Sequence, residues 1–374
     1  MNRLSIVLLS CISILLLLGL LMIYDITATE ILDRKLEVST QSMFLKQLFI
    51  SFAAILCGIA LYLIGYKKVI SSSYTLLWIG GALLFLVYFP HIGKQINGAH
   101  RWISIFGVSC QPSEFMKYII PMFFIFYCKQ HQGAITWPVF CRLFGIIAFF
   151  IGLIIFEPDN GTAAILFMQL LVLFFLAKIN WKYWVIPLCC LFSVAASFAI
   201  HMKHVPDRIR IYLHPELDIL GKGHQPYQAK LAAGSGGMYG KGFGASIQKF
   251  NYLPEAKSDY IAAIYAEEFG FIGMLFLILL YMLIALIGFY IALHAKDMEG
   301  FYLASVITFT ICFQAFLNLG VVSTLLPSKG TNLPFFSQGG SSLFANALAL
   351  ALLLDIHRKS EQKKSLPLIM RTQE

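Results

Sequence analysis

Apolar runs separated by polar connections recur along almost the whole chain, from Ser5 to Leu354. Most runs have the length that a helix needs to cross a bilayer, and all are longer than a barrel strand. Each is predicted to be a helix, because backbone amides in lipid must bond within their own segment. The runs lie near Ser5–Tyr24, Leu48–Ile64, Tyr74–Phe89, Ser113–Tyr127, Val139–Phe156, Thr162–Leu176, Trp184–Ile200, Ala262–Leu293, Tyr302–Gly320 and Ser341–Leu354. The pattern predicts an all-α, polytopic integral membrane protein with about ten transmembrane helices.

The polar connections differ greatly in length. The longest covers about residues 201–259 and is predicted to be a large extracytoplasmic loop. Because no polar block is large enough to fold by itself, residues 1–356 are assigned to one transmembrane domain. Residues 357–374 are polar and basic and are expected to form a disordered cytoplasmic tail. The apolar run after Arg3 is long enough to be a retained helix rather than a cleaved signal.

The distribution of lysine and arginine indicates the orientation, since short cytoplasmic connections are enriched in both. One side of the predicted bundle carries Lys67, Lys68, Lys129, Lys178, Lys182, Lys296 and the basic residues of the tail. This side is predicted to be cytoplasmic, with both termini on it and residues 201–259 on the opposite side.

Composition supports a membrane protein and argues against a soluble domain, a nucleic-acid partner and a zinc site. Hydrophobic residues make up 59% of the chain and charged residues only 13%, with a mean hydropathy of +0.76, which a soluble domain does not reach. The net charge of +9 is scattered, so we expect membrane lipids and no nucleic acid as partners. The eight cysteines lack zinc-site spacing and are expected to be free thiols; no metal site is predicted.

Polar and glycine-rich residues gather in the predicted outer connections 93–111, 201–259 and 323–340. Long loops on a rigid scaffold usually bind or catalyse. We therefore expect function on the outer side.

Two pairs of charged residues lie within the apolar runs. Glu114 and Lys117 are three residues apart on one helix face, where they can neutralise each other. A structural ion pair and a direct role near a substrate are equally compatible with this spacing. Glu267 and Glu268 lie about two turns into a later helix, and at least one of them must face protein or water.

Asp259 stands where the long loop returns to the membrane, beside apolar and aromatic neighbours. Desolvation there could raise its pKa and make it a general base. The alternative is an N-cap, which is a common role for Asp just before a helix.

Two glycine-rich stretches have both a binding and a structural interpretation. Gly234–Gly244 could cradle an anion, although it is not a nucleotide P-loop, and tight turns are the simpler explanation. In the stretch Ser337–Ser342, Ser341 or Ser342 could cap the last helix. The chain has no G-x-S-x-G nucleophile elbow, which argues against a serine hydrolase.

Seven motifs together resemble the SEDS family (shape, elongation, division and sporulation) over nearly the whole chain. They are Asn97-Gly98-Ala99 with Arg101-Trp102, Gln111-Pro112-Ser113-Glu114 with Lys117, Glu157 to Gly161, the glycine run ending in Gln248-Lys249, Leu253-Pro254-Glu255 through Asp259, Glu267-Glu268 with Gly270, and Leu326 to Ser342. Pro327-Ser328-Lys329-Gly330 looks like the division and sporulation branch rather than the elongation branch. Departures from the family pattern are Asn160, Lys257 and Gln338.

The resemblance implies a glycosyltransferase that polymerises lipid II, a disaccharide-pentapeptide on undecaprenyl pyrophosphate, at the outer face of the bacterial cytoplasmic membrane. Asp259 matches the essential aspartate of the family and would be the catalytic base. The residues expected to bind substrate are Arg101, Trp102, Glu114, Lys117, Gln248, Lys249, Glu255, Lys329, Ser337, Gly339, Gly340 and Ser341. Of these, Arg101, Lys249 and Lys329 are expected to neutralise the leaving pyrophosphate.

The family also implies partners, namely a class B penicillin-binding protein transpeptidase and divisome proteins at the division site. No cofactor is implied, and a divalent cation is left open. Three alternatives remain: a transporter that moves lipid II across the membrane, a non-catalytic divisome scaffold, and an elongation rather than a division role.

Overall fold

The computed structural model describes residues 3–34, 40–89, 92–96, 99–105, 108–131, 135–189, 212, 215–218, 221, 223–250, 253–327 and 330–365. The helices are α1 (Arg3–Arg34), α2 (Thr40–Ile64), α3 (Tyr66–Ser71), α4 (Ser73–Leu86), α5 (Pro112–Gln130), α6 (Trp137–Phe156), α7 (Asn160–Leu176), α10 (His224–Ser235), α11 (Ile261–Leu293), α12 (Met298–Val322) and α13 (Gly340–Ser365). The strands are β1 (Gly93–Ile96), β2 (Ala99–Ile105) and β3 (Val108–Cys110), and Pro215–Asp218 forms a 3-10 turn. Residues 181–189 are also helical.

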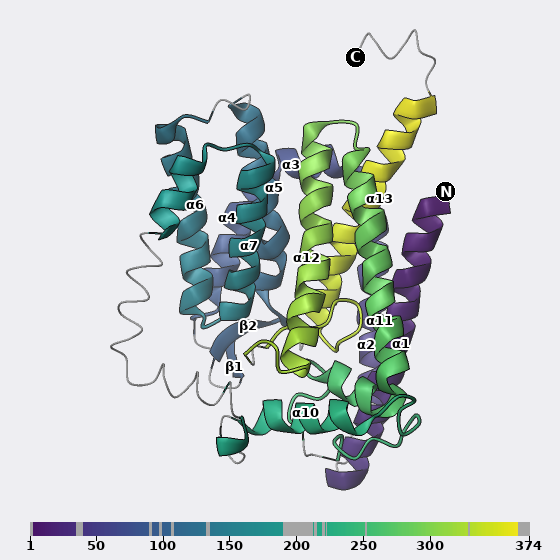
Figure 1. The fold of residues 1–374 in the computed structure, drawn as a ribbon. Helices are drawn as coiled ribbons and strands as arrows, with labels where there is room; N and C mark the ends of the chain where they lie inside the picture. Colours follow the sequence, from purple (N-terminus) through teal and green to yellow (C-terminus); the bar gives the residue numbers. More distant parts are fainter. Residues whose placement is uncertain are drawn as a thin grey trace.

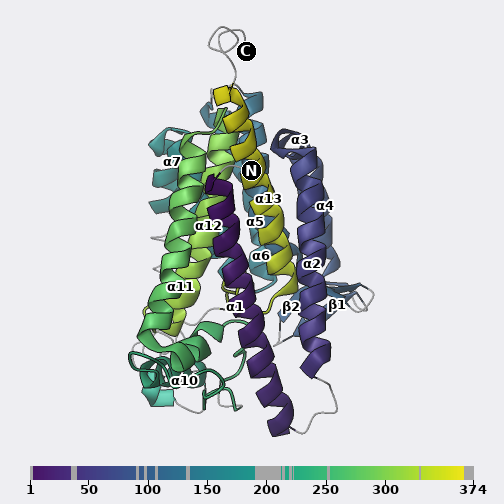
Figure 2. The same cartoon turned by 90° about the vertical axis from the view of Figure 1, so that its right-hand side faces the viewer.

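The long helices stand side by side in one bundle (Figure 1). The start of α1 and the end of α13 lie at the same end, which we call the terminal end, while α10 lies across the opposite end. We call this opposite end the pocket end. A view turned by 90° shows α1 beside α11 and α2 beside α13 (Figure 2).

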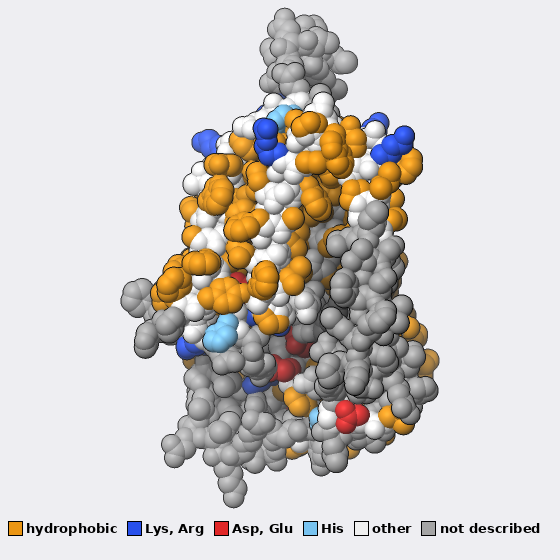
Figure 3. All heavy atoms as spheres, turned by 90° about the vertical axis from the view of Figure 1, so that its left-hand side faces the viewer, with side chains coloured by type: hydrophobic (Ala, Val, Ile, Leu, Met, Phe, Trp, Pro, Cys, Tyr) orange, Lys and Arg blue, Asp and Glu red, His pale blue; other side chains and the backbone are white. Residues whose placement is uncertain are grey.

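The prediction of a helical polytopic membrane protein is confirmed. Six of the described helices are long and apolar enough to cross a membrane, and α4 and α7 are shorter apolar helices. Each of the expected apolar segments corresponds to a described helix, although Trp184–Ile200 is described only as far as residue 189. On the flank seen in Figure 3, hydrophobic side chains form a broad band, with lysine and arginine side chains at the terminal end. This is the surface expected of a chain embedded in lipid.

Close packing inside the bundle depends on small residues. A Cβ atom at Gly81 of α4 would collide with the ring of Phe150 of α6, so only glycine lets this ring lie against the α4 backbone. Such small residues commonly allow helices to approach closely within membranes.

The connection between α4 and α5 contains a small sheet, which the all-α prediction did not include. Its three antiparallel strands have the order β1-β2-β3. The β1–β2 register shifts between Lys94 and Gln95. The sheet brings Arg101 and Trp102, on β2, to the pocket end of the bundle (Figure 1).

The prediction of a disordered tail from residue 357 is wrong for its first part, because α13 continues to Ser365. Local charge pairing explains the extra turns. Asp355 bonds the Arg358 guanidinium and lies 2.9 Å from Lys359 Nζ, at spacings of three and four residues. Residues 366–374 of the expected tail lie outside the described residues.

The same carboxylate fastens α13 to the rest of the terminal end. The Tyr66 N–H donates to Asp355 at 2.9 Å, and the Tyr66 hydroxyl donates to Asp297 at 2.8 Å. Asp297 also pairs with Lys67 and caps α12 through the N–H of Gly300. These bonds join α3, α12 and α13, so charged residues hold the helices together at the terminal end.

Candidate functional site

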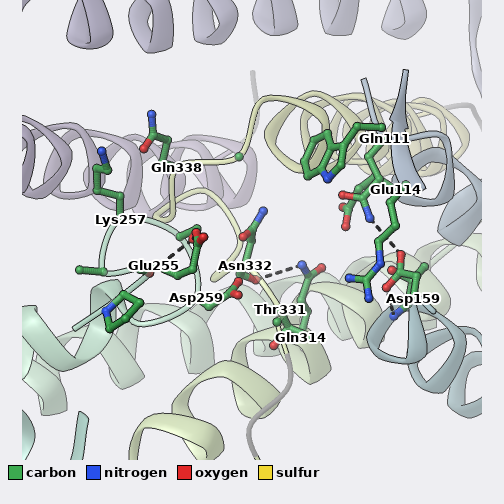
Figure 4. A pocket seen from close by; sticks show the side chains of 18 of the residues that line it. Gln111, Glu114, Asp159, Glu255, Lys257, Asp259, Gln314, Thr331, Asn332 and Gln338 are labelled. Carbon is green, nitrogen blue, oxygen red and sulfur yellow. Dashed lines mark hydrogen bonds between the residues drawn. The ribbon is translucent and has the colours of Figure 1, made fainter. Parts of the chain in front are cut away.

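The pocket end holds a cavity of about 640 Å³. Its walls come from segments far apart in the sequence. They are β2, the starts of α5 and α7, the loop before α11, the middle of α12, and the loop between α12 and α13. Most of its labelled side chains are polar or charged, and several of them point toward one another (Figure 4). Of the expected site residues, the cavity is lined by Arg101, Trp102, Glu114, Lys249, Glu255, Asp259 and Gly339.

Asp259 lies in the wall of this cavity, two residues before α11 begins. Its carboxylate lies against Gly330, where an added Cβ would stand 2.8 Å from Oδ2. The N-cap position of α11 is Tyr260, without a side-chain cap bond. The N-cap explanation for Asp259 is therefore not supported.

The surroundings of Asp259 raise its pKa to about 7. Burial is the largest cause, because the charged form loses its hydration. The negative charge of Glu255 adds to the increase, and the positive charge of Arg101 opposes it. Asp259 is thus a carboxylate that exchanges its proton near neutral pH.

Arg101 reaches the cavity from β2. Its Nε donates to the backbone carbonyl of Glu157 at 3.0 Å, and its Nη2 donates to the carbonyl of Pro158. These carbonyls orient the guanidinium without neutralising it. A cation held in this way can stabilise an anion bound in the cavity.

Asp159 joins α5 to α7 beside the cavity. Its Oδ1 accepts from the N–H of Thr162 and so caps α7. Its Oδ2 accepts from Gln111 Nε2 at 2.9 Å and from Ser113 Oγ at 2.7 Å. The network is buried, and Gln111 and Asp159 both line the cavity.

The expected pair of Glu114 and Lys117 is present beneath the cavity. Lys117 Nζ lies 2.6 Å from Glu114 Oε2 and donates to Gln314 Oε1 at 3.0 Å. Gln314 in turn donates to the carbonyl of Asn332 at 3.0 Å. Lys117 is fully buried and supports the cavity wall, whereas Glu114 lines it.

Asn318, one turn after Gln314 on α12, holds two parts of the wall together. Its Nδ2 donates to the carbonyl of Asp259 at 2.8 Å and to the carbonyl of Thr331 at 2.7 Å. This places the backbone of Asp259 next to the loop that contains Gly330.

Lys249 was expected to face the leaving pyrophosphate, but its charge is already matched. Its Nζ lies 2.7 Å from Asp25 of α1 and 3.0 Å from Glu268 of α11. It therefore joins two helices at the cavity edge, and two carboxylates already pair with its charge. Gln248 binds Glu267 through its backbone N–H and is not among the residues lining the cavity.

The remaining expected residues have structural contacts. Ser337 accepts from the N–H of Leu333 at 2.8 Å, and Ser341 accepts from the N–H of Gln111 at 2.9 Å. Gly340 packs near Ile50. Lys329 lies outside the described residues.

The list of expected site residues omitted several cavity residues. Gln111, Asp159, Thr331 and Asn332 lay within the motifs but were not assigned to the site, and Gln314 lay in none of the motifs. A signal existed for Gln314, because a polar residue inside a spanning helix is unusual, and Asn318 follows it at helical spacing. Among the described residues, no cluster of three or more His, Cys, Asp or Glu side chains could hold a metal ion.

Comparisons with known proteins agree over most of the chain. Residues 5–362 match the FtsW/RodA/SpoVE family, described as a cell cycle protein. The chain is 34% identical to the probable peptidoglycan glycosyltransferase FtsW of Coxiella burnetii, over 94% of this chain and 95% of that protein. It is 35% identical to stage V sporulation protein E of Bacillus subtilis, over 93% of this chain and 95% of that protein.

Solved structures show the same fold. The rod shape determining protein RodA of Thermus thermophilus superposes with a TM-score of 0.67 at 24% identity, covering 94% of this chain and 96% of that chain. A chain from a study of polymerization and crosslinking by a peptidoglycan synthase complex gives a TM-score of 0.71 at 24% identity, covering 91% of this chain and 97% of that chain.

Proposed function

The chain belongs to the FtsW/RodA/SpoVE family of cell cycle proteins, the SEDS family, and we propose from this that it is a peptidoglycan glycosyltransferase that polymerises lipid II. The relatives named as probable peptidoglycan glycosyltransferases FtsW support this activity. The observation that carries the mechanism is the position of Asp259 in the cavity wall, with a pKa of about 7 and with Arg101 lining the same cavity.

In the proposed reaction, a sugar 4-hydroxyl of one lipid-linked glycan attacks the anomeric carbon of the other. The new C–O bond forms as the bond from that carbon to the diphosphate oxygen breaks. Asp259 accepts the hydroxyl proton, a contribution of typically about 10² to 10⁴ in rate. A pKa near the working pH suits this role, because the carboxylate is ionised yet still basic. A single in-line displacement inverts the configuration at the anomeric carbon.

Arg101 is proposed to stabilise the departing diphosphate. Its guanidinium is fixed by two carbonyls and lines the cavity together with Asp259. Fixed donors aimed at developing charge lower the barrier without reorganising during the reaction. Lys249 is better described as a residue that holds the cavity edge, because Asp25 and Glu268 already neutralise it. Lys329 stays a prediction.

We place the terminal end in the cytoplasm and the cavity at the outer face of the bacterial inner membrane. The positive-inside rule assigns to the cytoplasm those short connections and helix ends that are rich in lysine and arginine. At the terminal end these include Lys67, Lys129, Lys296 and the basic end of α13. Relatives named FtsW favour a role in cell division at the division site. A class B penicillin-binding protein transpeptidase and divisome proteins are the proposed partners.

The test is glycan synthesis from lipid II by purified full-length protein together with its transpeptidase partner. Asp259→Asn keeps the shape of the side chain but cannot accept a proton, so we expect the rate to fall by about 10² or more. Asp218→Asn is the matched control, because Asp218 lies in the Pro215–Asp218 turn outside the cavity lining. Unchanged synthesis by a folded Asp259→Asn protein would remove Asp259 from the mechanism.

A transporter of lipid II is the second candidate, and the buried charges of Glu114 and Lys117 inside the bundle are the observation that favours it. The two functions separate when lipid II is supplied already on the pocket side. A glycosyltransferase makes glycan from it, whereas a transporter does not. A non-catalytic scaffold would keep its cellular role after Asp259→Asn.

A further inference from the structure

The glycine-rich segment between α10 and α11 presents large apolar side chains outward. The exposed fractions are 59% for Met238, 82% for Tyr239, 56% for Phe243 and 57% for Ile247. A cluster of this kind is costly in water and usually marks a contact surface. The segment lies beside α10 at the pocket end (Figure 1). Its residue Lys249 lines the cavity.

Backbone hydrogen bonds fix this segment at one height along α11. Its N–H groups at Lys241 and Gly242 donate to the carbonyls of Glu267 and Glu268, each at 3.0 Å. In return, the N–H of Phe271 donates to Gly237 at 2.9 Å. This interlocking is possible because Gly270 has a φ of 64°, which interrupts the helical bonding of α11.

The exposure of α11 shows where its lipid-facing part begins. Residues 261–268 are buried, whereas Phe271 and Ile272 are 58% and 48% exposed, and exposed apolar side chains continue to Leu293. The stretch from Phe271 to Leu293 is about 33 Å long at about 1.5 Å per residue. The hydrocarbon core of a bilayer is about 30 Å thick. Phe271 and the segment bonded to it therefore lie at the membrane boundary.

The length of helix α1 independently indicates the same level for the segment in the membrane. Arg3 stands at its start near the terminal end, and Asp25 follows after about 33 Å of helix. Asp25 binds Lys249, the residue just beyond the apolar cluster, at 2.7 Å. A Cβ added at Gly244 would lie 3.7 Å from Asp25 Oδ1. Two helices thus place the segment at the level of the headgroups on the pocket side.

We propose that residues 238–247 form an interfacial anchor, in which Met238, Tyr239, Phe243 and Ile247 insert into the boundary between headgroups and acyl chains. The partner is the bilayer itself. Tyrosine and tryptophan are enriched at this depth because an apolar ring and a polar group are both satisfied there, as for Tyr239. The side chains of Met238, Phe243 and Ile247 are apolar and gain by leaving water. The anchored surface is continuous with the lipid-facing Phe271 and Ile272 of α11. The proposal does not depend on the enzymatic activity.

The anchor would also fix the height of the cavity. Glu267 accepts from the Ser246 hydroxyl and the Ile247 N–H, and Lys249 is held by Asp25 and Glu268. The residues between Lys249 and Asp259 therefore follow directly on a segment that is fixed at headgroup level.

The test measures the depth of single nitroxide labels on the full-length protein in lipid nanodiscs, in a background without its native cysteines. Labels at Tyr239→Cys and Phe243→Cys probe the anchor. Met282→Cys, on the lipid-facing part of α11, is the reference within the hydrocarbon. Lys230→Cys, on the exposed face of α10, is the reference in water. Collisions with oxygen are compared with collisions with a water-soluble nickel chelate.

We expect the ratio of oxygen to nickel collisions at both anchor positions to be several-fold higher than at Lys230→Cys. A ratio equal to that at Lys230→Cys would show that the segment faces water and would overturn the proposal. Protection from both reagents would also overturn it, because the segment would then be covered by protein. Tyr239 and Phe243 are exposed, so their replacement leaves the packed core unchanged.

Discussion

Asp259 differs from the other carboxylates of the site in combining a raised pKa with access to the cavity. Glu157 also has a raised pKa, of about 8, because it is buried near Asp159. Its side chain, however, is fully buried and is not among the residues that line the cavity. Asp159 and Glu114 do line it, but their carboxylates already bind Gln111 and Lys117 respectively. Glu255 lines it as well, but its side chain is exposed and accepts from the Ser258 hydroxyl at 2.8 Å. Among the described residues, Asp259 is therefore the acid best placed to take a proton from a bound hydroxyl.

The raised pKa of Asp259 has a consequence for stability. The folded protein holds this proton to about pH 7, whereas the ordinary pKa is 3.8. The associated stabilisation is complete below the ordinary pKa and is lost as the pH rises through about 7. We therefore expect Asp259→Asn to raise the Tm relative to the unmodified protein at about pH 8, and to change it little at about pH 4. Thermal unfolding in one detergent across this range checks the difference, and a lower Tm for the variant at the higher pH would contradict it.

Because Glu114 and Lys117 form a buried pair, we expect substitutions of the two residues to change stability non-additively. Lys117→Met leaves the Glu114 charge without its ion-pair partner and should cost about 3–5 kcal/mol of stability. Adding Glu114→Gln removes that charge, so the double variant should recover much of the loss. The comparison requires thermal unfolding of both single variants and the double variant. A double variant less stable than Lys117→Met would show that the pair does not interact as described.

At the scale of elements, the sequence predicted where helices lie better than how they connect. The segment Ala262–Leu293 was expected to be one apolar helix, and α11 covers it, but the interruption at Gly270 was not foreseen. The positive φ there depends on hydrogen bonds from a distant segment, which periodicity cannot show. Likewise, the strands from Gly93 to Cys110 are too short and too polar to produce a clear alternating pattern.

Gly270→Ala should destabilise the junction of α11 and the glycine-rich segment. An added Cβ would collide with the backbone of Gly240 and Met238, and the φ of 64° is unfavourable for alanine. We expect a loss of at least about 1–2 kcal/mol. Gly145→Ala on α6 is the matched control, since nothing lies within 4 Å of its added Cβ. Equal Tm values for the two variants would contradict the strained junction.

For the whole molecule, the sequence predicted the membrane bundle because hydrophobicity is a local property. The cavity depends on contacts between distant residues, such as Lys249 with Asp25 and Asn318 with the carbonyl of Asp259. The motif resemblance indicated many of the residues that gather there, but not the contacts that hold them. It assigned Lys249 to the leaving pyrophosphate, and a lysine in a loop gives no sign of the two carboxylates from other helices that pair with it.

The most direct test of the central claim is the pH dependence of kcat/KM for glycan synthesis from lipid II. If Asp259 is the base, activity should increase with pH through about 7, where the carboxyl of the free protein loses its proton. Because the positive charge of Arg101 lowers this pKa, Arg101→Gln should move the acid limb to higher pH as well as reduce the rate. An acid limb that stays near the ordinary carboxyl range, or that persists unchanged in Asp259→Asn, would contradict the assignment of Asp259.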